Sequence, residues 1–259
     1  MFNPSSKVSA INSGADSVAS EHFRKVFEIA KRISELSNFV YDPTIGPISD
    51  LWGFGRNEIN GQPSDSAIEA ALAAVGIAEC SISESGIVHK KSPATVFDFS
   101  SVAKGYGIDL VGAMLQKNGV KNYMIEIGGE ILVLGVNPDG RPWHIQIDAP
   151  SSGPGHRPLE ILSLGPEKTA VASSGNYRNY RHRTDGTTYG HTLSPTTGRP
   201  VQGQIAAATI IASDCATADA IATACMAAAV PDSALAIIRR GDVRGIVAAV
   251  EGDSLKVFR

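Results

Sequence analysis

One acidic side chain lies inside one of the most apolar stretches of the sequence. Asp219 stands among alanines between Cys215 and Met226, where an ionised carboxylate costs several kcal/mol unless a cation or a set of donors compensates it. The alanines predict a helix that Pro231 ends, so Asp219 and Thr223 present their oxygens on one face. A carboxylate and a hydroxyl on one face suit a hard cation such as Mg²⁺. The alternative is a buried Asp that is satisfied by backbone donors or by an arginine.

A second segment, which joins a predicted strand to a predicted helix, could bind phosphate. Asp98 is followed by Ser100 and Ser101 at the start of the helix and by Lys104 in its first turns. Free amides at a helix N-terminus attract anions, especially beside a lysine, although the glycine pattern of a Walker loop is absent. Plain capping accounts for the same residues, because a serine would satisfy the first amides and Asp98 would interact favourably with the helix dipole.

Two glycine-rich stretches could bring the backbone close to a ligand. Gly128 and Gly129 interrupt what would otherwise be one long strand, either as a simple bend or as a close approach to a bound molecule. The loop from Asp42 to Gly55 could be a rigid surface excursion, but its large apolar side chains indicate that it folds back over another part of the chain.

The most polar part of the sequence contains the best candidate for a general base. Residues 173–180 and 189–200 are rich in Ser, Thr, Asn and Tyr, and Asp185 and Gly186 between them predict an antiparallel hairpin. A single histidine is usually structural, but His191 lies among Ser, Thr and Gly opposite a polar strand, which favours proton transfer. No serine or cysteine has the nucleophile-elbow pattern, which argues against acyl transfer through a covalent serine.

Helical and extended patterns alternate along the chain without a fixed repeat. We expect helices at 20–37, 63–75, 100–118, 215–230 and 232–240, and strands at 120–126, 131–136, 143–148, 159–164, 169–174, 205–212, 243–249 and 254–258. Strands outnumber helices and several are joined by hairpin-type turns, which predicts an α+β fold with a mixed or antiparallel sheet packed with helices. A single domain is expected over residues 1–259, and the Pro- and Gly-rich loop at 150–158 is the candidate for an internal boundary.

Composition argues against several classes of protein. The 23 basic and 26 acidic residues give a net charge of −3, which predicts no nucleic-acid binding. Cys80, Cys215 and Cys225 do not have the spacing of metal ligands, and we expect them to be buried like small apolar residues. No stretch reaches the roughly 18 apolar residues that a transmembrane segment needs. Met1 leads directly into Phe2 without a signal-peptide pattern.

Taken together, these segments resemble the ApbE family, the FAD:protein FMN transferases. The matching segments follow the family's order over roughly residues 2–250; they are Tyr41–Pro47 with Leu51–Gly55, Asp98–Tyr106, Ile127–Glu130, Pro142 with Trp143, Ser174–Asn179, His191–Gly198 and Ala218–Thr223. The resemblance implies a T-fold-like α+β architecture, FAD as substrate and Mg²⁺ as cofactor. It also implies that the FAD pyrophosphate is cleaved, AMP is released, and FMN is attached to a Thr or Ser hydroxyl of a partner protein.

The resemblance further implies roles for individual residues. Asp219 and Thr223 would hold the metal together with an oxygen of Ser101, and His191 would take the proton from the acceptor hydroxyl, so that His191 and Asp219 are the expected catalytic residues. The FAD site would be lined by Val40, Tyr41, Asp42, Asp98, Lys104 and Leu193, with Gly128 and Gly129 close to it. Phosphoryl transfer depends mostly on positioning and on neutralisation of the bridging oxygens, which this set would provide.

The resemblance leaves some alternatives open. Family members usually carry a signal peptide, an opening strand and a helix before the segment that matches Phe2–Ser6, so we expect an unpaired sheet edge with an exposed apolar patch, or a homo-oligomer that covers it. The family points to the cell envelope, whereas the sequence as printed would stay in the cytoplasm. Two other functions are an FAD pyrophosphatase that gives FMN and AMP, and a non-catalytic FAD-binding module.

Overall fold

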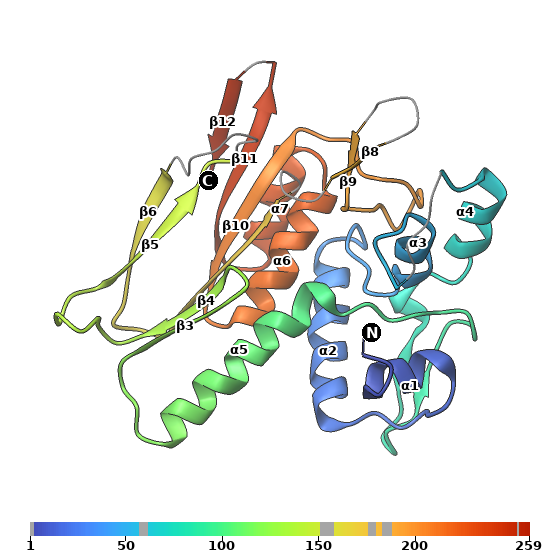
Figure 1. Cartoon of the computed structure of the whole chain (residues 1–259), viewed down its shortest axis with the longest axis horizontal. Coiled ribbons are helices and arrows are strands. Elements are labelled where there is room, and N and C mark those ends of the chain that lie inside the picture. The colour runs from blue at the N-terminus through green and yellow to red at the C-terminus, as the bar shows by residue number, and fades with distance from the viewer. Residues whose placement is uncertain (1–2, 57–61, 151–157, 176–179, 183–187, 253) are drawn as a thin grey trace. The chain divides into compact units, whose positions relative to one another are not determined.

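The chain forms two compact units, and most of their helices and strands are labelled in Figure 1. The computed structural model describes residues 3–56, 62–150, 158–175, 180–182, 188–252 and 254–259. Unit 1 comprises Met1–Ser101 and Asn179–Val201, and unit 2 comprises Val102–Arg178 and Gln202–Arg259. The loop at 150–158 lies mostly outside the described residues, and the single domain over residues 1–259 stays a prediction.

Unit 2 is built on a six-stranded sheet in which every pair of neighbouring strands is antiparallel. The strand order is β12–β11–β10–β7–β4–β3. The strands are β3 (Tyr123–Ile127), β4 (Glu130–Leu134), β7 (Thr169–Gly175), β10 (Ile205–Ala212), β11 (Arg244–Glu251) and β12 (Ser254–Phe258). Each corresponds to a strand expected from the sequence, and the α+β class with an antiparallel sheet and packed helices is confirmed.

Small side chains allow one helix to lie close against this sheet. In its described residues, unit 2 has three helices: α5 (Ser100–Lys117), whose first two residues belong to unit 1, α6 (Cys215–Ala227) and α7 (Pro231–Arg240). Helix α6 packs on β7 and β10. Ala172 of β7, Ala208 of β10 and Ala222 of α6 are fully buried. Because alanine adds little bulk, the α6 backbone lies close to the sheet.

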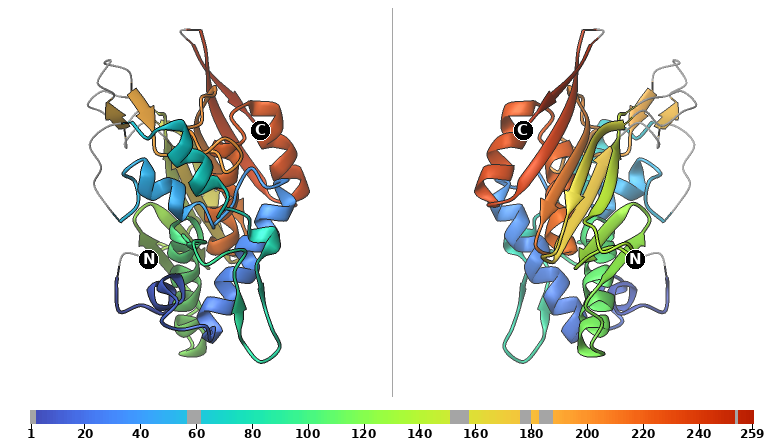
Figure 2. Two further views of the ribbon diagram at one scale, coloured as in Figure 1. Left: turned by 90° about the vertical axis from the view of Figure 1, so that its right-hand side faces the viewer. Right: turned by 90° about the vertical axis from the view of Figure 1, so that its left-hand side faces the viewer.

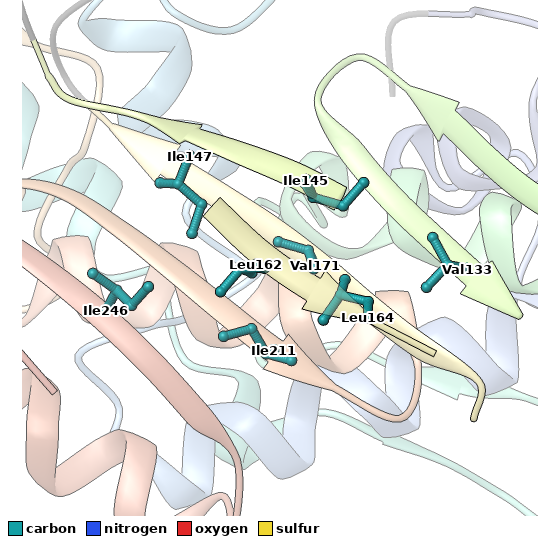
Figure 3. Close-up of a cluster of buried hydrophobic side chains, with 8 residues drawn as sticks. All are labelled: Val133, Ile145, Ile147, Leu162, Leu164, Val171, Ile211 and Ile246. Carbon is teal, nitrogen blue, oxygen red and sulfur yellow. The ribbon is translucent and has the colours of Figure 1, made fainter. Parts of the chain in front are cut away.

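The opposite face of the sheet is covered by a hairpin of β5 (Trp143–Asp148) and β6 (Pro158–Leu164), as the right-hand view of Figure 2 shows. Figure 3 shows the cluster of buried side chains that joins the hairpin to the sheet; its members are Val133, Ile145, Ile147, Leu162, Leu164, Val171, Ile211 and Ile246. Each fully buried aliphatic side chain stabilises a fold by about 1.5–3 kcal/mol relative to exposure. This cluster therefore fixes the hairpin on the sheet.

Unit 1 is mostly helical. It contains α1 (Lys7–Ser13), α2 (Glu21–Leu36), α3 (Gly46–Leu51), α4 (Asp65–Leu72), the 3₁₀ helix η1 (Ile77–Glu79), and two short hairpins of β1 (Ser81–Ile82) with β2 (Val88–His89) and of β8 (Tyr180–His182) with β9 (Thr188–Gly190). The predicted helices at 20–37 and 63–75 correspond to α2 and α4, which Ser20 and Ser64 cap. Helices α1 and α3 were not expected.

Two apolar clusters position the functional segments of unit 1. Phe97 and Phe99 lie on either side of Asp98 and pack against Phe23 and Phe27 of α2, with ring centroids 5.4 to 5.9 Å apart in the edge-to-face pairs. These contacts fix the chain just before α5. The second cluster consists of buried residues of α3 and α4, of the chain just after each of these helices, and of the segment after β9: Ile48, Trp52, Ile68, Val75 and Leu193.

The antiparallel hairpin expected between 173–180 and 189–200 is confirmed close to its turn and wrong further from it. In the described residues, Tyr180 pairs with Gly190, and the pairing continues toward the turn as far as His182 opposite Thr188. Ser173 and Ser174 instead lie near the end of strand β7 and pair with β10. Their strand contains the buried residues Ala170 and Ala172, which belong to the central sheet, and the two serines continue it. Asp185 and Gly186, the expected turn, lie outside the described residues.

Several expectations from composition can be compared with the described residues. The three cysteines are free and buried, and burial raises the pKa of the Cys225 thiol to about 12. Among the described helices, none is long and apolar enough to cross a membrane. Within the described part of the sheet, β3 is an edge strand, and its Met124 and Ile127 are 47% and 46% exposed. The homo-oligomer stays a prediction.

Candidate active site

The carboxylate of Asp219 lies where α6 passes very close to α5. Its residue is 3% exposed, and its Oδ2 accepts a hydrogen bond of 3.2 Å from the backbone N–H of Gly105 in α5. A Cβ atom on residue 105 would overlap the carbonyl of Cys215 and would lie 2.7 Å from the nitrogen of Ala216. Glycine at position 105 is therefore what allows the two helix backbones to approach and Gly105 to reach Asp219.

Gly105→Ala is expected to lower the free energy of unfolding by about 1–3 kcal/mol, because the added methyl group must push α6 away from α5. Urea denaturation would measure this change. Gly107→Ala is the matched control on the same helix, since a Cβ atom there meets nothing within 4 Å. It is expected to stabilise the helix by up to about 1 kcal/mol. Equal effects of the two substitutions would contradict the close-approach explanation.

A second acidic residue of α5 fixes the start of α6. Asp109 accepts hydrogen bonds from the backbone nitrogens of Cys215 and Ala216, at 2.8 and 2.9 Å. Asp214 caps the same helix and accepts from the nitrogen of Thr217 at 2.8 Å. Carboxylates at a helix N-terminus satisfy free amides and interact favourably with the helix dipole. These bonds set how α6 is placed on α5 and thereby where Asp219 lies.

Asp219 is held in an environment that opposes its charge. Burial raises the pKa of Asp219 to about 6, the nearby Lys104 ammonium acts against this rise, and the Glu130 carboxylate adds to it. Lys104 forms an ion pair with Glu130, the first residue of β4, which is 3% exposed. Two buried acids and one lysine thus lie close together in unit 2. A buried acid with a raised pKa beside other charges is a common sign of a functional site.

Thr223 follows Asp219 by one helical turn, as the sequence predicted, because α6 is continuous from Cys215 to Ala227. Its hydroxyl lies 3.4 Å from the hydroxyl of Ser174 at the end of β7. Ser174 shares its strand face with the alanines that contact α6, which explains why it meets Thr223. The result is a row of a carboxylate and two hydroxyls along one side of α6.

The oxygen donors at this place fit a divalent cation. Among the described residues, no group of three or more His, Cys, Asp or Glu side chains lies close enough together to form a metal centre. A cation at Asp219 would therefore take its remaining ligands from hydroxyl or carbonyl oxygens and water, which is how Mg²⁺ is usually bound. The alternative of backbone compensation has partial support, since Gly105 donates one hydrogen bond to Asp219.

The turn between β3 and β4 lies beside Lys104. Gly128 and Gly129 have φ angles of 64° and 99°, a left-handed conformation that glycine adopts without strain. The nitrogen of Gly129 donates to Glu126 Oε1 at 2.8 Å. A Cβ atom on residue 128 would lie 3.6 Å from Cδ of Lys104. The interpretation of these glycines as a bend is confirmed, and their closeness to FAD stays a prediction.

In unit 1, the start of α5 is joined to the loop after α2. The hydroxyl of Ser101 donates to the hydroxyl of Tyr41 at 3.0 Å, and the nitrogen of Asp98 donates to the carbonyl of Pro43 at 2.6 Å. Asp98 Oδ1 accepts from the nitrogen of Ser100 at 3.0 Å. A first amide of the helix is thus satisfied, as the capping interpretation expects, but Asp98 accepts the bond in place of a serine. The shared role of Tyr41, Asp98 and Ser101 in one site stays a prediction.

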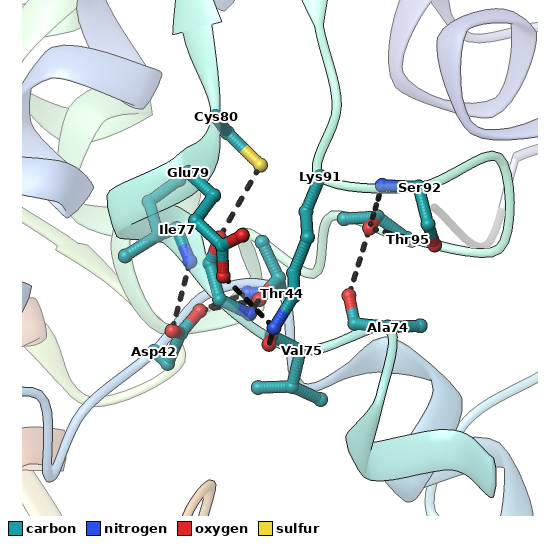
Figure 4. A network of polar contacts seen from close by, with 11 residues as sticks. Asp42, Thr44, Ala74, Val75, Ile77, Glu79, Cys80, Lys91, Ser92 and Thr95 are labelled. Carbon is teal, nitrogen blue, oxygen red and sulfur yellow. Dashed lines mark hydrogen bonds and ion pairs between the residues drawn. The ribbon is translucent and has the colours of Figure 1, made fainter.

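Asp42 is directed into the protein. Figure 4 shows it in a buried network: one carboxylate oxygen accepts from the nitrogen and hydroxyl of Thr44, and the other accepts from the nitrogen of Ile77 at 3.0 Å. The Thr44 hydroxyl in turn accepts from the nitrogen of Gly76 at 2.7 Å. These bonds hold the loop that carries Tyr41 against the turn after α4. Contact between Asp42 and FAD stays a prediction.

His191 follows β9 directly and lies in an aromatic environment. Its ring meets that of Phe54 at a tilted angle, with 6.3 Å between centroids, and Tyr189 contacts both Phe54 and Trp52. Trp52 donates from Nε1 to the carbonyl of Gly198 at 2.7 Å. The expectation that the loop at 42–55 folds back over the chain is therefore confirmed. The role of His191 as a base stays a prediction.

The predicted site residues thus fall into two groups, one in each unit. Unit 2 brings together Asp219, Thr223, Lys104, Gly128 and Gly129. Unit 1 contains the other predicted residues, which are Val40, Tyr41, Asp42, Asp98, Ser101, His191 and Leu193. Leu193 is 8% exposed within the apolar cluster around Ile48 and Trp52, and Val40 is half-buried.

Sequence reasoning did not assign roles to four residues that shape this site: Gly105, Asp109, Glu130 and Ser174. Glu130 had a visible signal, because it is an acid that directly precedes the apolar run of a predicted strand. Gly105 and Asp109 had none, since their partners lie in α6, more than a hundred residues further along the chain.

Comparison with known proteins gives consistent results. The sequence model of the ApbE family matches residues 1–247. A FAD:protein FMN transferase of Vibrio cholerae is 40% identical over 204 residues, which are 78% of this chain and 59% of that protein. The FAD:protein FMN transferase of Escherichia coli K12 is 30% identical over 245 residues, covering 92% of this chain and 68% of that protein.

A solved structure is also similar over almost the whole chain. The flavin transferase ApbE from Vibrio cholerae superposes with a TM-score of 0.88 at 33% identity, covering 99% of this chain and 81% of that one. The chain spans 59% of the length of the first curated relative. The activity of these longer proteins therefore supports a proposal for this chain only together with the residues of the chain itself.

Proposed function

The chain belongs to the ApbE family, and from this membership we propose that it transfers FMN from FAD to a Thr or Ser hydroxyl of a partner protein, with Mg²⁺ as cofactor and AMP as the second product. Three features support the proposal. They are the names of the relatives, the buried and destabilised carboxylate of Asp219, and the positive charge of Lys104 near the first turn of α5.

The reaction exchanges one ester of the FMN phosphate for another. The acceptor oxygen forms a bond to the phosphorus of the FMN half, and the bond from that phosphorus to the bridging oxygen breaks, so AMP leaves with the bonding electrons. The hydroxyl proton passes to a ring nitrogen of His191, which makes the acceptor oxygen a better nucleophile. When bound, Mg²⁺ supplies neutralisation of charge on the diphosphate oxygens.

The single observation that carries the proposal is the state of Asp219. An acid whose pKa burial has raised to about 6 is an expensive structural element, and an alanine or asparagine in a plain helix interface would avoid this cost. The cost is explained if a cation binds there. Asp219 and Thr223 would hold it, and an oxygen of Ser101 is proposed as the third protein ligand.

The test is an assay that follows both halves of FAD. The purified chain is incubated with FAD, Mg²⁺ and a flavin-depleted protein extract of its own source organism, and AMP is quantified by chromatography. Acceptor residues are identified by mass spectrometry as Thr or Ser that carry one FMN. We expect AMP and labelled protein in equal amounts, and neither with EDTA.

Other outcomes identify the other functions. AMP and free FMN formed without the extract, at a rate comparable to transfer, would indicate a pyrophosphatase. FAD that stays bound without any AMP release would indicate a binding module without turnover, and would contradict the proposal.

A further inference from the structure

The proposed reaction does not use Glu130, although Glu130 is one of the most deeply buried acids in the described part of unit 2. It is 3% exposed, and its Oε2 forms an ion pair with the Lys104 ammonium. Burying a carboxylate is costly unless an opposite charge compensates it. Lys104 compensates Glu130, which raises the question of what the pair contributes to the site.

The Lys104 ammonium acts on two carboxylates. It forms the ion pair with Glu130, and it also lowers the pKa of Asp219, which burial raises. The next residue, Gly105, donates its N–H to Asp219. A lysine at this position, without another partner, would be attracted to Asp219 and would compete there with any cation.

We propose that Glu130 is a positioning residue that holds the Lys104 ammonium off Asp219, so that the Asp219 carboxylate stays available to a divalent cation. The inference deepens the proposed function and rests on it, because it assumes that a cation binds at Asp219. It assigns Glu130 to neither metal nor substrate. Glu130 acts through Lys104.

The turn that carries Glu130 is suited to this role. Gly128 and Gly129 place Glu130 directly after a tight left-handed turn, and the bond from Gly129 to Glu126 fastens that turn. The same turn lies against the aliphatic stem of Lys104. The β3–β4 turn therefore contacts the aliphatic stem of Lys104, and Glu130 next to it binds the ammonium group. The two contacts limit the rotamers that this long side chain can adopt.

The experiment measures Mg²⁺ binding to the metal-free, FAD-free chain by calorimetry. Glu130→Gln keeps the size of the side chain and removes its charge, so Lys104 can turn to Asp219. We expect the Kd for Mg²⁺ to rise about tenfold, a typical coupling between close charges. In the double variant Glu130→Gln with Lys104→Met the competing charge is gone, and the Kd is expected to return to within about threefold of wild type.

The double variant separates positioning from a structural role. If Glu130 mattered only for folding of the turn, removal of Lys104 as well would not restore Mg²⁺ binding. Should Glu130→Gln fail to fold, Glu130→Asp serves the same purpose, since the shorter side chain weakens the ion pair and is expected to raise the Kd by a smaller factor. An unchanged Kd in the single variant, or no recovery in the double variant, overturns the inference.

The failure of the proposed metal site can be told apart from the failure of this inference. Wild-type protein that binds no Mg²⁺, or that binds it as well after Asp219→Asn, overturns both. Wild-type binding that Asp219→Asn removes and Glu130→Gln leaves unchanged overturns the role of Glu130 alone.

Discussion

Asp219→Asn is expected to abolish FAD turnover and, at the same time, to make the metal-free protein more stable at neutral pH. Activity should fall by roughly 10³-fold or more, because a bound metal ion supplies several kcal/mol of charge stabilisation in the transition state. The gain in stability has a separate cause. Asparagine has the size of aspartate and carries no charge, so it removes the penalty of burying an ionised group in the alanine-packed interface.

The pH dependence of this effect follows from the direction of the pKa shift. Burial raises the pKa of Asp219 from 3.8 to about 6, so the folded protein binds this proton more tightly than the unfolded chain does. The protonated carboxyl therefore adds to the free energy of unfolding. This contribution is fully present below the pKa that Asp219 has in the unfolded chain, and it is lost as the pH rises through the pKa that Asp219 has in the folded protein. The loss amounts to about 2–3 kcal/mol, and Asp219→Asn should not show it.

Urea denaturation in EDTA, at several pH values from mildly acidic to neutral, would measure the difference between wild type and Asp219→Asn. The difference is informative because burial also raises the pKa of Asp109, which contributes to both proteins alike. With Mg²⁺ at a hundred times its Kd, wild type should gain about 2.7 kcal/mol, and the variant should gain nothing.

Asp232→Asn is a suitable control for this experiment, since Asp232 is an exposed acid in the first turn of α7. It should keep the activity, the pH profile and the Mg²⁺ response of wild type. Identical pH profiles and Mg²⁺ responses for wild type and Asp219→Asn would show that this carboxylate is not the metal ligand.

The elements that could be predicted from the sequence are those with strong local signals. Helix α2 has an apolar stripe and a serine cap, and α6 has an uninterrupted run of alanines. Helix α3 escaped prediction because it is six residues long and begins with Gly46 and Pro47, which in sequence are equally typical of a loop. Tertiary contacts of Ile48 and Trp52, more than local propensity, hold it in place.

The candidate site was predictable to the extent that single residues reveal an unfavourable environment. Asp219 stands out because its neighbours are apolar. Asp42 was expected beside FAD, but nothing in its sequence neighbourhood indicates that its oxygens bind the amides of Thr44 and Ile77. The pairing of Lys104 with Glu130 was equally hidden, because it depends on how α5 packs beside the β3–β4 turn.

His191→Asn is expected to lower FMN transfer by about 10²–10⁴-fold, the usual contribution of a positioned general base, and to leave the Mg²⁺ response intact. Asparagine can keep a hydrogen bond but cannot accept the acceptor's proton. The assay is the one that follows AMP and labelled protein, combined with thermal unfolding with and without Mg²⁺. His144→Asn is the matched control, because His144 is exposed on β5 and should be replaceable without effect.

The two variants together test the division of roles between the units. Asp219→Asn should lose both turnover and the Mg²⁺ response, whereas His191→Asn should lose turnover alone. If His191→Asn transfers FMN at a rate within about threefold of wild type, another group takes the proton. Loss of a general base is expected to lower the rate by about 10²-fold or more. Loss of the Mg²⁺ response in His191→Asn would instead mean that the histidine supports cation binding, and the assignment of the base would have to be withdrawn.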